Sequence, residues 1–478
     1  MLVSINNKSL LQINISNLQK LVNINDKKSL EKILKNLHSA DLADVINKME
    51  NLSEVLYLVR LLDSKIASEV FINLDTEIKI MLLNELNNTE ITQIVNQLYA
   101  DDIVELLEQI PEEVVKKLII NASRDKRKEI NILLNYEENS AGSIMSVDFV
   151  QLLQHEKVGQ ALEKVKQLGE RAENSDKYYV TDSKNKLLGV ISLRNLVFAN
   201  SKEEVNSVME TNVVSVDAHS DQELVANIVQ KYDLNEVAVV NKQNVLIGII
   251  TVDDILDVME EEATEDIEKL AAIKPTEMLY LKTPVWRIVR SRIFWLLFLL
   301  VSATFSELVI DAFLPLFGAN KNSSDLSNKF LTLLVPLLPI IADTGGNSGS
   351  QASTTIVRAL SLGDVTVKDY GQVVWKELRI SFFVGLILIC FNFIRMIIIN
   401  LIKYDGVLHW DQWASMITIS LSLWIVIIIS KVAGGILPII AKLLRMDPAV
   451  MAAPLVTTII DCVSTTIFFS IALLFFVT

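Results

Sequence analysis

Asp461 is a lone acidic residue near the middle of the last apolar run of the chain. An ionised carboxylate at the centre of a bilayer costs several kcal/mol unless water or a counter-ion accompanies it. Four hydroxyl residues lie three and four positions away, on the same face of a helix: Thr457, Thr458, Ser464 and Thr465. Oxygen ligands without thiolate or imidazole favour Mg²⁺, Ca²⁺ or monovalent ions over zinc or copper. The pattern predicts a hard-cation site, with an ion pair to Arg395 or Lys431 as the alternative.

A polar, glycine-rich segment, residues 343–355, directly follows the apolar run 330–342. That run is about 20 Å long as a helix, shorter than the roughly 30 Å of a hydrocarbon core, so the polar segment begins at membrane depth. Irregular polar backbone is tolerated there only where it lines water or is buried in protein. We predict a break at 344–351 that lines a hydrated pathway; the alternative is a loop outside the membrane. The residues expected to line the pathway are Thr344, Gly345, Gly346 and Asn347.

An acidic segment leads into the first apolar run. Asp254, Asp257 and Glu261 share one helical face, where like charges repel unless a cation bridges them. Further acidic residues follow: Glu260, Glu262, Glu265 and Asp266. The concentration of acids on this linker predicts a divalent-ion sensor, with a solvated acidic helix as the alternative.

Five apolar runs would carry these residues through a membrane. They occupy roughly 293–310, 330–342 with its continuation, 382–401, 414–437 and 450–477. Lys and Arg concentrate before the first run, between the second and third, and between the fourth and fifth. Because cytoplasmic loops carry the excess of positive charge, we predict five spans in the cell membrane, with a cytoplasmic N-terminus and an extracytoplasmic C-terminus.

Charge divides the chain into unlike parts. Residues 1–272 carry 46 acidic and 28 basic side chains, whereas residues 273–478 carry 12 and 16. The acidity of the first part argues against a nucleic-acid partner. Cys390 and Cys462 lie in apolar runs with no His or Cys at ligand spacing, so neither a zinc site nor a disulfide framework is indicated. An enzyme is not expected either, because the chain has no nucleophile–base constellation and no phosphate-binding loop.

Two internal repeats organise the acidic part. Apolar residues recur every twelve positions at the start of helical segments, which predicts short helices stacked in a superhelix: Leu62, Leu74, Leu86, Leu98 and Ile110. Further on, Ser143-Ile144-Met145 is echoed by Ser207-Val208-Met209, and residues 188–192 by 247–251. Each copy has the pattern helix, strand, turn, strand, helix, and the pair resembles tandem CBS (cystathionine β-synthase) modules.

Further motifs make the chain resemble the MgtE family of magnesium transporters over nearly its whole length. They are Tyr136-Glu137-Glu138 with Ala141-Gly142, the runs 251–258 and 262–267, the segment 344–351, and Asp447-Pro448-Ala449 followed by 454–456 and Asp461. The resemblance implies a multidomain homodimer. Each subunit would have an all-α superhelical N domain (1–135), α/β CBS modules (136–200 and 201–262), a connecting helix (263–285) and a five-helix transmembrane pore domain (286–478).

The resemblance also implies where ions bind. The family's pore carboxylate falls on Asp461, and its cytosolic magnesium sites fall on Glu69, Asp101, Glu105, Asp221, Glu223, Asp233, Asp254, Asp257, Glu262, Glu265 and Asp266. Glu105 replaces the family's Asp, and Ala453 replaces an Asn near the pore ion. Some members bind ATP between the CBS modules. Here Arg194 matches that site, whereas Asn195 replaces the acid expected for the ribose, so ATP as a regulator stays an open expectation.

The expected function is Mg²⁺ uptake through a Mg²⁺-selective channel or transporter that closes when cytosolic Mg²⁺ binds the acidic sites. Its expected partners are Mg²⁺, the lipid bilayer and a second copy of the chain. Two alternatives stay open from the sequence. One is a Na⁺-coupled Mg²⁺ exchanger, and the other is a membrane-anchored CBS protein that senses ions or nucleotide without transport.

Overall fold

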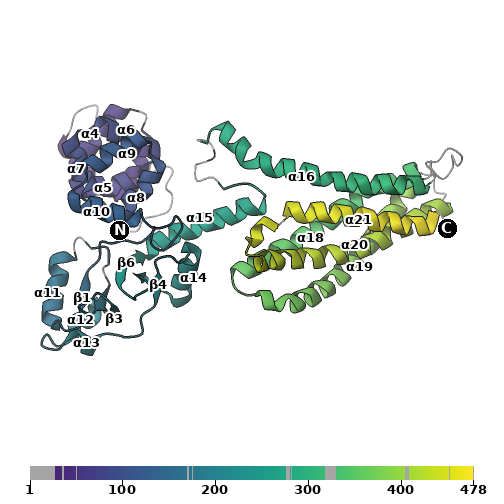
Figure 1. The fold of residues 1–478 in the computed structure, drawn as a ribbon. Helices are drawn as coiled ribbons and strands as arrows, with labels where there is room; N and C mark the ends of the chain where they lie inside the picture. The colour runs from purple at the N-terminus through teal and green to yellow at the C-terminus, as the bar shows by residue number, and fades with distance from the viewer. Residues whose placement is uncertain are drawn as a thin grey trace. The chain divides into compact units, whose positions relative to one another are not determined.

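A computed structural model describes residues 27–34, 37–49, 51–169, 172–174, 176–275, 280, 283–317, 330–403, 409–451 and 453–476. The chain divides into two compact units, Met1–Glu260 and Glu261–Thr478 (Figure 1). Residues 1–26 of the predicted N domain lie outside the described residues, as do residues 276–279 and 281–282 of the predicted connecting helix.

The first unit begins with a superhelix of short helices: α2 (Lys27–Leu34), α3 (Ser39–Asn47), α4 (Leu52–Leu61), α5 (Ser64–Ile72), α6 (Thr76–Glu85), α7 (Asn88–Val95), α8 (Ala100–Gln109), α9 (Glu112–Asn121) and α10 (Arg124–Leu133). From α4 to α10 each helix begins twelve residues after the one before it. The repeat residues Leu74, Leu86 and Leu98 are buried. Helices two places apart in the chain pack against each other, as α5 packs against α7. The predicted superhelix is confirmed.

Two small α/β modules follow. The first contains β1 (Gln151–Leu153), α11 (Val158–Leu168), β2 (Lys177–Thr181), β3 (Leu187–Ser192) and α12 (Leu193–Phe198). The second contains α13 (Val205–Val208), β4 (Ser215–Asp217), α14 (Gln222–Tyr232), β5 (Glu236–Val240) and β6 (Leu246–Thr251). In each sheet the first strand pairs parallel and the third antiparallel to the middle strand. The predicted turns end at Asn185 and Asn244, whose φ values of 59° and 62° suit asparagine.

The sequence echo between the modules has a packing explanation. A Cβ added to Gly248 of the second module would lie 2.5 Å from the Sδ of Met145, near the start of the first module. A Cβ added to Gly189 of the first module would lie 2.7 Å from the Sδ of Met209, which begins the second. Each methionine therefore occupies the space left by a glycine of the other module, and the repeated residues hold the two modules together.

The acidic linker forms α15 (Val252–Leu270), which starts at the end of β6 and carries all the predicted linker acids. It ends before Ala272, whose φ is 55°. The first part of the predicted connecting helix, residues 263–270, is therefore the end of α15 and not a separate helix.

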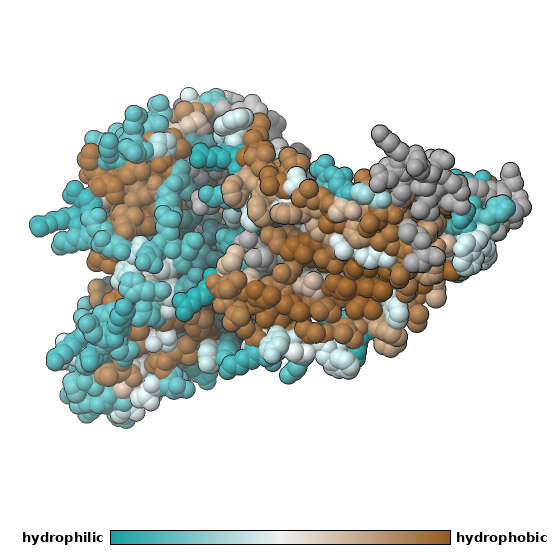
Figure 2. Space-filling model, turned by 45° about the vertical axis from the view of Figure 1, so that its right-hand side comes forward, coloured by the Kyte–Doolittle hydropathy of each residue, from teal (hydrophilic) through white to brown (hydrophobic). Residues whose placement is uncertain are grey.

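The second unit is a helical bundle: α16 (Val285–Phe313), η1 (Leu314–Phe317), η2 (Phe330–Leu334), η3 (Val335–Leu337), α18 (Leu338–Ser361), η4 (Val367–Asp369), α19 (Tyr370–Lys403), α20 (Trp410–Leu443), η5 (Pro448–Met451) and α21 (Ala453–Phe476). Within the described residues, four segments are long and apolar enough to cross a membrane: Val285–Phe317, Val367–Lys403, Trp410–Leu443 and Pro454–Phe476. Figure 2 shows hydrophobic side chains over much of the bundle surface, as lipid contact requires. The second predicted span, residues 330–342 with its continuation, falls on η2, η3 and α18, and α18 packs against α20 and α21.

The predicted break at 344–351 is wrong. α18 is a continuous helix through all of these residues, and the irregular backbone lies before it, in the π turn of η2 and the 3₁₀ turn of η3. The glycines serve packing: a Cβ on Gly345 would lie 2.6 Å from Val426, and a Cβ on Gly434 of α20 would overlap the carbonyl of Gly349. Small residues let the helix backbones approach closely, while the helix satisfies its own backbone hydrogen bonds.

Candidate functional site

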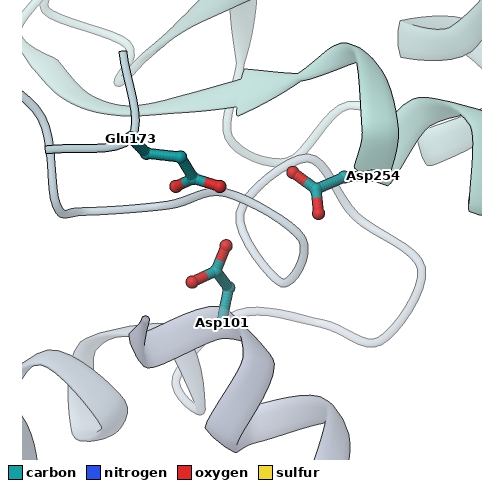
Figure 3. Close-up of side chains that lie close together, drawn as sticks. All are labelled: Asp101, Glu173 and Asp254. Atoms are coloured by element: carbon teal, nitrogen blue, oxygen red, sulfur yellow. The ribbon is translucent and has the colours of Figure 1, made fainter. Parts of the chain in front are cut away.

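Three carboxylates from distant parts of the first unit meet at one point. Asp101 lies on α8, Glu173 lies in the segment after α11, and Asp254 lies on α15. One carboxylate oxygen of each lies within 4.8 Å of the others, and Figure 3 shows the three side chains pointing toward a common centre. The cluster therefore joins the superhelix, the first CBS module and the helix that leaves the second module.

Local structure holds each of the three side chains. Asp101 occupies the first turn of α8, where the helix dipole favours an anion. The hydroxyl of Thr251 donates to Asp254 Oδ2 at 2.6 Å, which leaves Oδ1 for another partner. The N–H of Glu173 donates to the carbonyl of Asp148 at 2.8 Å, and its carboxylate accepts a hydrogen bond from Ser146. Each side chain is thus positioned before any ligand arrives.

The three carboxyls of the cluster are buried and lie close to other acids, and both conditions raise their pKa values. Burial, followed by the charges of Glu173 and Asp102, raises the pKa of Asp101 well above its ordinary value. Burial raises the pKa of Glu173 to about 8. The hydrogen bond from Ser146 lowers this pKa in part, and the negative charge of Asp254 raises it further. Burial also raises the pKa of Asp254 to about 6. A cation among the three carboxylates would remove this repulsion.

Unpartnered oxygens identify what the cluster could bind. Asp101 Oδ1 and Glu173 Oε2 are enclosed and have no hydrogen-bond partner among the described residues. Carboxylate oxygens without sulfur or imidazole ligands suit Mg²⁺ or Ca²⁺. The residues therefore fit a divalent hard cation, and three carboxylates leave room for the waters that Mg²⁺ usually retains.

Sequence reasoning found Asp101 and Asp254 but missed Glu173 and two neighbours. Glu173 lies in no motif, and no spacing relates it to residues 101 or 254. Asp102, whose pKa burial raises to about 6, feels the charge of Asp254. Burial, and then the charges of Glu173 and nearby aspartates, raises the pKa of Tyr99 to about 12. Tyr99 and Asp102 lie within two residues of Asp101 in the sequence, so their presence near the site could have been predicted. Nothing in the sequence points to Glu173.

The other predicted N-domain ligands lie outside the cluster. Glu105, one turn after Asp101 on α8, accepts a hydrogen bond from Gln109 at 3.2 Å. Burial lowers the pKa of Lys79, and the negative charge of Glu105 opposes that change. Glu69 is exposed on α5. Their assignment as magnesium ligands stays a prediction.

The three predicted CBS ligands fall at opposite ends of α14. Asp221 caps the helix by accepting from the N–H of Glu223 at 2.9 Å, while Asp233 ends it with φ of 48°. The 11 residues between Asp221 and Asp233 span about 16 Å, so within one chain Asp233 cannot share an ion with the other two. Arg194, the predicted nucleotide ligand, is exposed on α12.

The linker acids lie along α15. Asp257, one turn after Asp254, has a pKa raised by burial and by the charge of Asp253. Glu262, Glu265 and Asp266 lie on the second half of the helix, and Glu265 forms an ion pair with Lys269. Burial, followed by the charge of Asp447, raises the pKa of Asp266.

Asp461 lies partly buried on α21. The four predicted hydroxyls donate to main-chain carbonyls of the same helix: Thr457 and Thr458 to Pro454, and Ser464 and Thr465 to Asp461. They therefore line its surroundings without binding its carboxylate. Among the described residues Asp461 has no ion pair with Arg395 or Lys431; Arg395 donates a hydrogen bond to Asn392 instead.

A second acid, which sequence reasoning did not assign, accompanies Asp461. That acid is Asp343, on α18. Asp343 and Asn347 are exposed one turn apart on α18, and a Cβ on Gly346 would lie 3.1 Å from Thr457 of α21. The polar face of α18 is thus adjacent to the Asp461 face of α21. Of the predicted pathway residues, Asn347 is exposed, Thr344 is partly buried, and Gly345 and Gly346 are buried against neighbouring helices.

Comparison with known families agrees with this architecture. Residues 338–471 match MgtE, described as a divalent cation transporter, and residues 37–139 match the MgtE intracellular N domain. Residues 141–202 and 205–261 each match the CBS domain.

Individual relatives extend the match over nearly the whole chain. The magnesium transporter MgtE of Bacillus subtilis is 31% identical over 443 residues, which is 93% of each chain. The magnesium transporter MgtE of Thermus thermophilus is 29% identical over 459 residues, 95% of this chain and 97% of that one. A crystal structure of the soluble part of a magnesium transporter superposes with a TM-score of 0.50 at 27% identity, covering 53% of this chain and 99% of that one.

Proposed function

Because the chain belongs to the MgtE family of magnesium transporters, we propose that it is a Mg²⁺-selective channel for magnesium uptake that cytosolic Mg²⁺ closes. The observation that carries the regulatory part of this proposal is the cluster of Asp101, Glu173 and Asp254, whose oxygens lie within 4.8 Å of one another. The three residues come from three different parts of the cytosolic portion. An ion held among them would bind those parts to one another.

The gating argument rests on differential affinity. A ligand shifts a conformational equilibrium only by as much as it prefers one state. When the superhelix and the CBS modules are close, three carboxylates repel each other and Mg²⁺ is bound tightly. When they separate, each carboxylate is hydrated alone and binds Mg²⁺ weakly. Abundant Mg²⁺ therefore favours the compact arrangement, which through α15 closes the pore, and scarcity of Mg²⁺ releases it.

For the pore we propose that Asp461 attracts the hydrated ion, with Asp343 adding to the negative potential. In a symmetric homodimer, two copies of Asp461 near the axis would hold Mg²⁺ with several of its waters retained. The N-terminus would lie in the cytoplasm and the C-terminus outside, with α18 as the second of five spans.

ATP is proposed as a regulator that binds between the CBS modules. This part of the proposal rests on Arg194 and on the family resemblance, and Asn195 lacks the carboxylate expected to bind a ribose. Calorimetric titration of the full-length protein with ATP, beside an Arg194→Ala variant, measures this directly; equal heats from the two proteins would contradict a role for Arg194.

The cluster is tested by neutralising it. In the triple variant Asp101→Asn, Glu173→Gln and Asp254→Asn, repulsion and ion binding disappear together, so high internal Mg²⁺ should no longer stop Mg²⁺ flux into proteoliposomes. The control variant neutralises three exposed acids of the same unit, Glu112, Glu163 and Glu203, to Gln. It should close like the natural protein. Unchanged inhibition in the cluster variant would contradict the gating proposal.

A further inference from the structure

One lysine joins the end of the acidic linker helix to the membrane bundle within the second unit. Lys269 Nζ lies 2.7 Å from Glu265 Oε1, one turn earlier on α15, and 2.7 Å from Asp447 Oδ2, between α20 and η5. The three side chains are 25%, 34% and 35% exposed, respectively, so solvent screens the two ion pairs only in part. Asp447 is far from Glu265 in sequence, and Lys269 is the group that links them.

Asp447 connects this contact to the pore helix. Its other oxygen, Oδ1, accepts a hydrogen bond from the N–H of Ala449 at 2.9 Å and so caps η5. η5 leads directly into α21, which carries Asp461. A displacement of α15 that broke the Lys269 contact would therefore act on the turn that begins the pore helix.

The charges around Lys269 show why an ammonium is retained there. The negative charge of Asp447 raises the pKa of Asp266, whereas the positive charges of Lys269 and then of Arg358, at the end of α18, lower it. Burial alone would lower the pKa of Lys269, but its hydrogen bonds to Asp447 and Glu265 outweigh burial and raise it. The lysine thus stays charged through the physiological range and offsets repulsion between the linker acids and Asp447.

We propose that Lys269 is a positioning residue of the gate, an internal cation that tethers α15 to the α20–α21 turn and stabilises the closed arrangement alongside Mg²⁺. This inference rests on the proposed function, because it assigns a second source of closing free energy to the same linker. Its consequence is quantitative: with the tether present, less cytosolic Mg²⁺ suffices to close the pore.

The test uses full-length protein, four variants at Lys269 and Asp447, and one control variant. Lys269→Gln removes the cation, and Lys269→Arg restores a charge that can bridge two carboxylates. Asp447→Asn removes the partner charge but keeps a side-chain oxygen able to cap η5. The fourth variant combines Lys269→Gln with Asp447→Asn. Lys274→Gln is the matched control, because Lys274 is an exposed lysine five residues further along whose backbone N–H binds Ser291.

Two measurements separate the tether from the gate. Hydrogen exchange of residues 262–272 should be faster in Lys269→Gln and in Asp447→Asn, and no faster in the double variant, because each single change breaks the same contact. The Mg²⁺ concentration that halves flux should rise roughly two- to five-fold in the same three proteins, as expected for a partly exposed ion-pair network. Lys269→Arg and Lys274→Gln should behave like the natural protein.

Each failure has a different meaning. Unchanged exchange in Lys269→Gln would overturn the tether itself. Faster exchange with an unchanged half-inhibitory concentration would overturn its role in gating. A natural protein insensitive to internal Mg²⁺ would overturn the proposed function, whereas the exchange result would still report on the contact.

Discussion

At the scale of single residues, the cluster of Asp101, Glu173 and Asp254 has the properties of a site built for a ligand that arrives from solution. Two of its oxygens are enclosed without a partner, and the pKa values of its carboxyls lie above the ordinary range. A structural ion pair would have brought a lysine or arginine to the same place. Here the fold brings three carboxylates together without a basic side chain among them, so a cation from solution would compensate their negative charge.

The raised pKa values predict a pH dependence. The carboxyls of Asp254 and Glu173 have pKa values of about 6 and about 8, above the roughly 4 expected in an unfolded chain. Without divalent ions these two carboxyls bind protons more readily in the folded protein than in the unfolded chain. Their contribution to stability is therefore greatest below about pH 4 and is lost as the pH rises from about 4 through 6 for Asp254 and through 8 for Glu173. Mg²⁺ competes with those protons, so its affinity should increase over the same window, by up to about tenfold per pH unit where one proton is displaced.

Hydrogen exchange of residues 99–105 and 251–257, with and without Mg²⁺, checks this at both ends of the window. Mg²⁺ should slow exchange strongly near pH 8 and weakly near pH 6, and the cluster variant should show no Mg²⁺ effect at either. Equal protection at the two pH values would mean that protons and Mg²⁺ do not share these carboxylates.

At the scale of elements, the small residues of α18 and α20 decide how the bundle packs. Gly345, Gly346 and Gly349 lie on α18 where side chains or backbone of α20 and α21 come within van der Waals contact of an added Cβ. In a membrane, helix association depends on such packing and less on burial of apolar surface, because lipid is as apolar as the side chains. The glycine-rich sequence, which predicts a loop in a soluble protein, here gives a tightly packed helix.

Substituting Gly434 tests this packing. A Cβ there meets the carbonyl of Gly349, so Gly434→Ala should force α20 away from α18 and destabilise the folded bundle by about 1 to 3 kcal/mol. Thermal unfolding in detergent measures the loss. Gly371→Ala is the matched control, since an added Cβ has open space on α19, and it should be neutral or slightly stabilising. Equal unfolding temperatures for the two variants would contradict close packing at Gly434.

At the scale of the whole molecule, the chain is a multi-pass membrane protein with a large acidic portion before its bundle. The division between the two units falls within α15: the helix begins after β6 and carries Asp254, and its last turns, up to Leu270, belong to the second unit, where Lys269 pairs with Asp447. Under the proposed function, this helix would connect the carboxylate cluster of the first unit to the turn before α21 in the second.

Transport itself is tested at Asp461. Asp461→Asn should reduce Mg²⁺ flux by at least about tenfold, because it removes the charge that compensates a divalent ion in the membrane. Glu307→Gln, a matched change at an exposed acid of α16, should leave flux intact. Flux measured with and without a Na⁺ gradient separates a channel from an exchanger. Dependence on that gradient would favour exchange, and absence of flux in the natural protein would favour a sensor without transport.

The sequence by itself determined the repeats and the membrane segments, because periodicity and hydropathy depend only on residues close together in the chain. The assignment of Asp461 as the pore carboxylate stays a prediction. The twelve-residue spacing predicted the superhelix, and the echoed Met and Gly residues predicted the paired modules. Only the tertiary structure decided that α18 is continuous, that Glu173 joins Asp101 and Asp254, and that Lys269 reaches Asp447. The physical reason is the same in each case: these features depend on contacts between residues far apart in the chain, and no local pattern records such contacts.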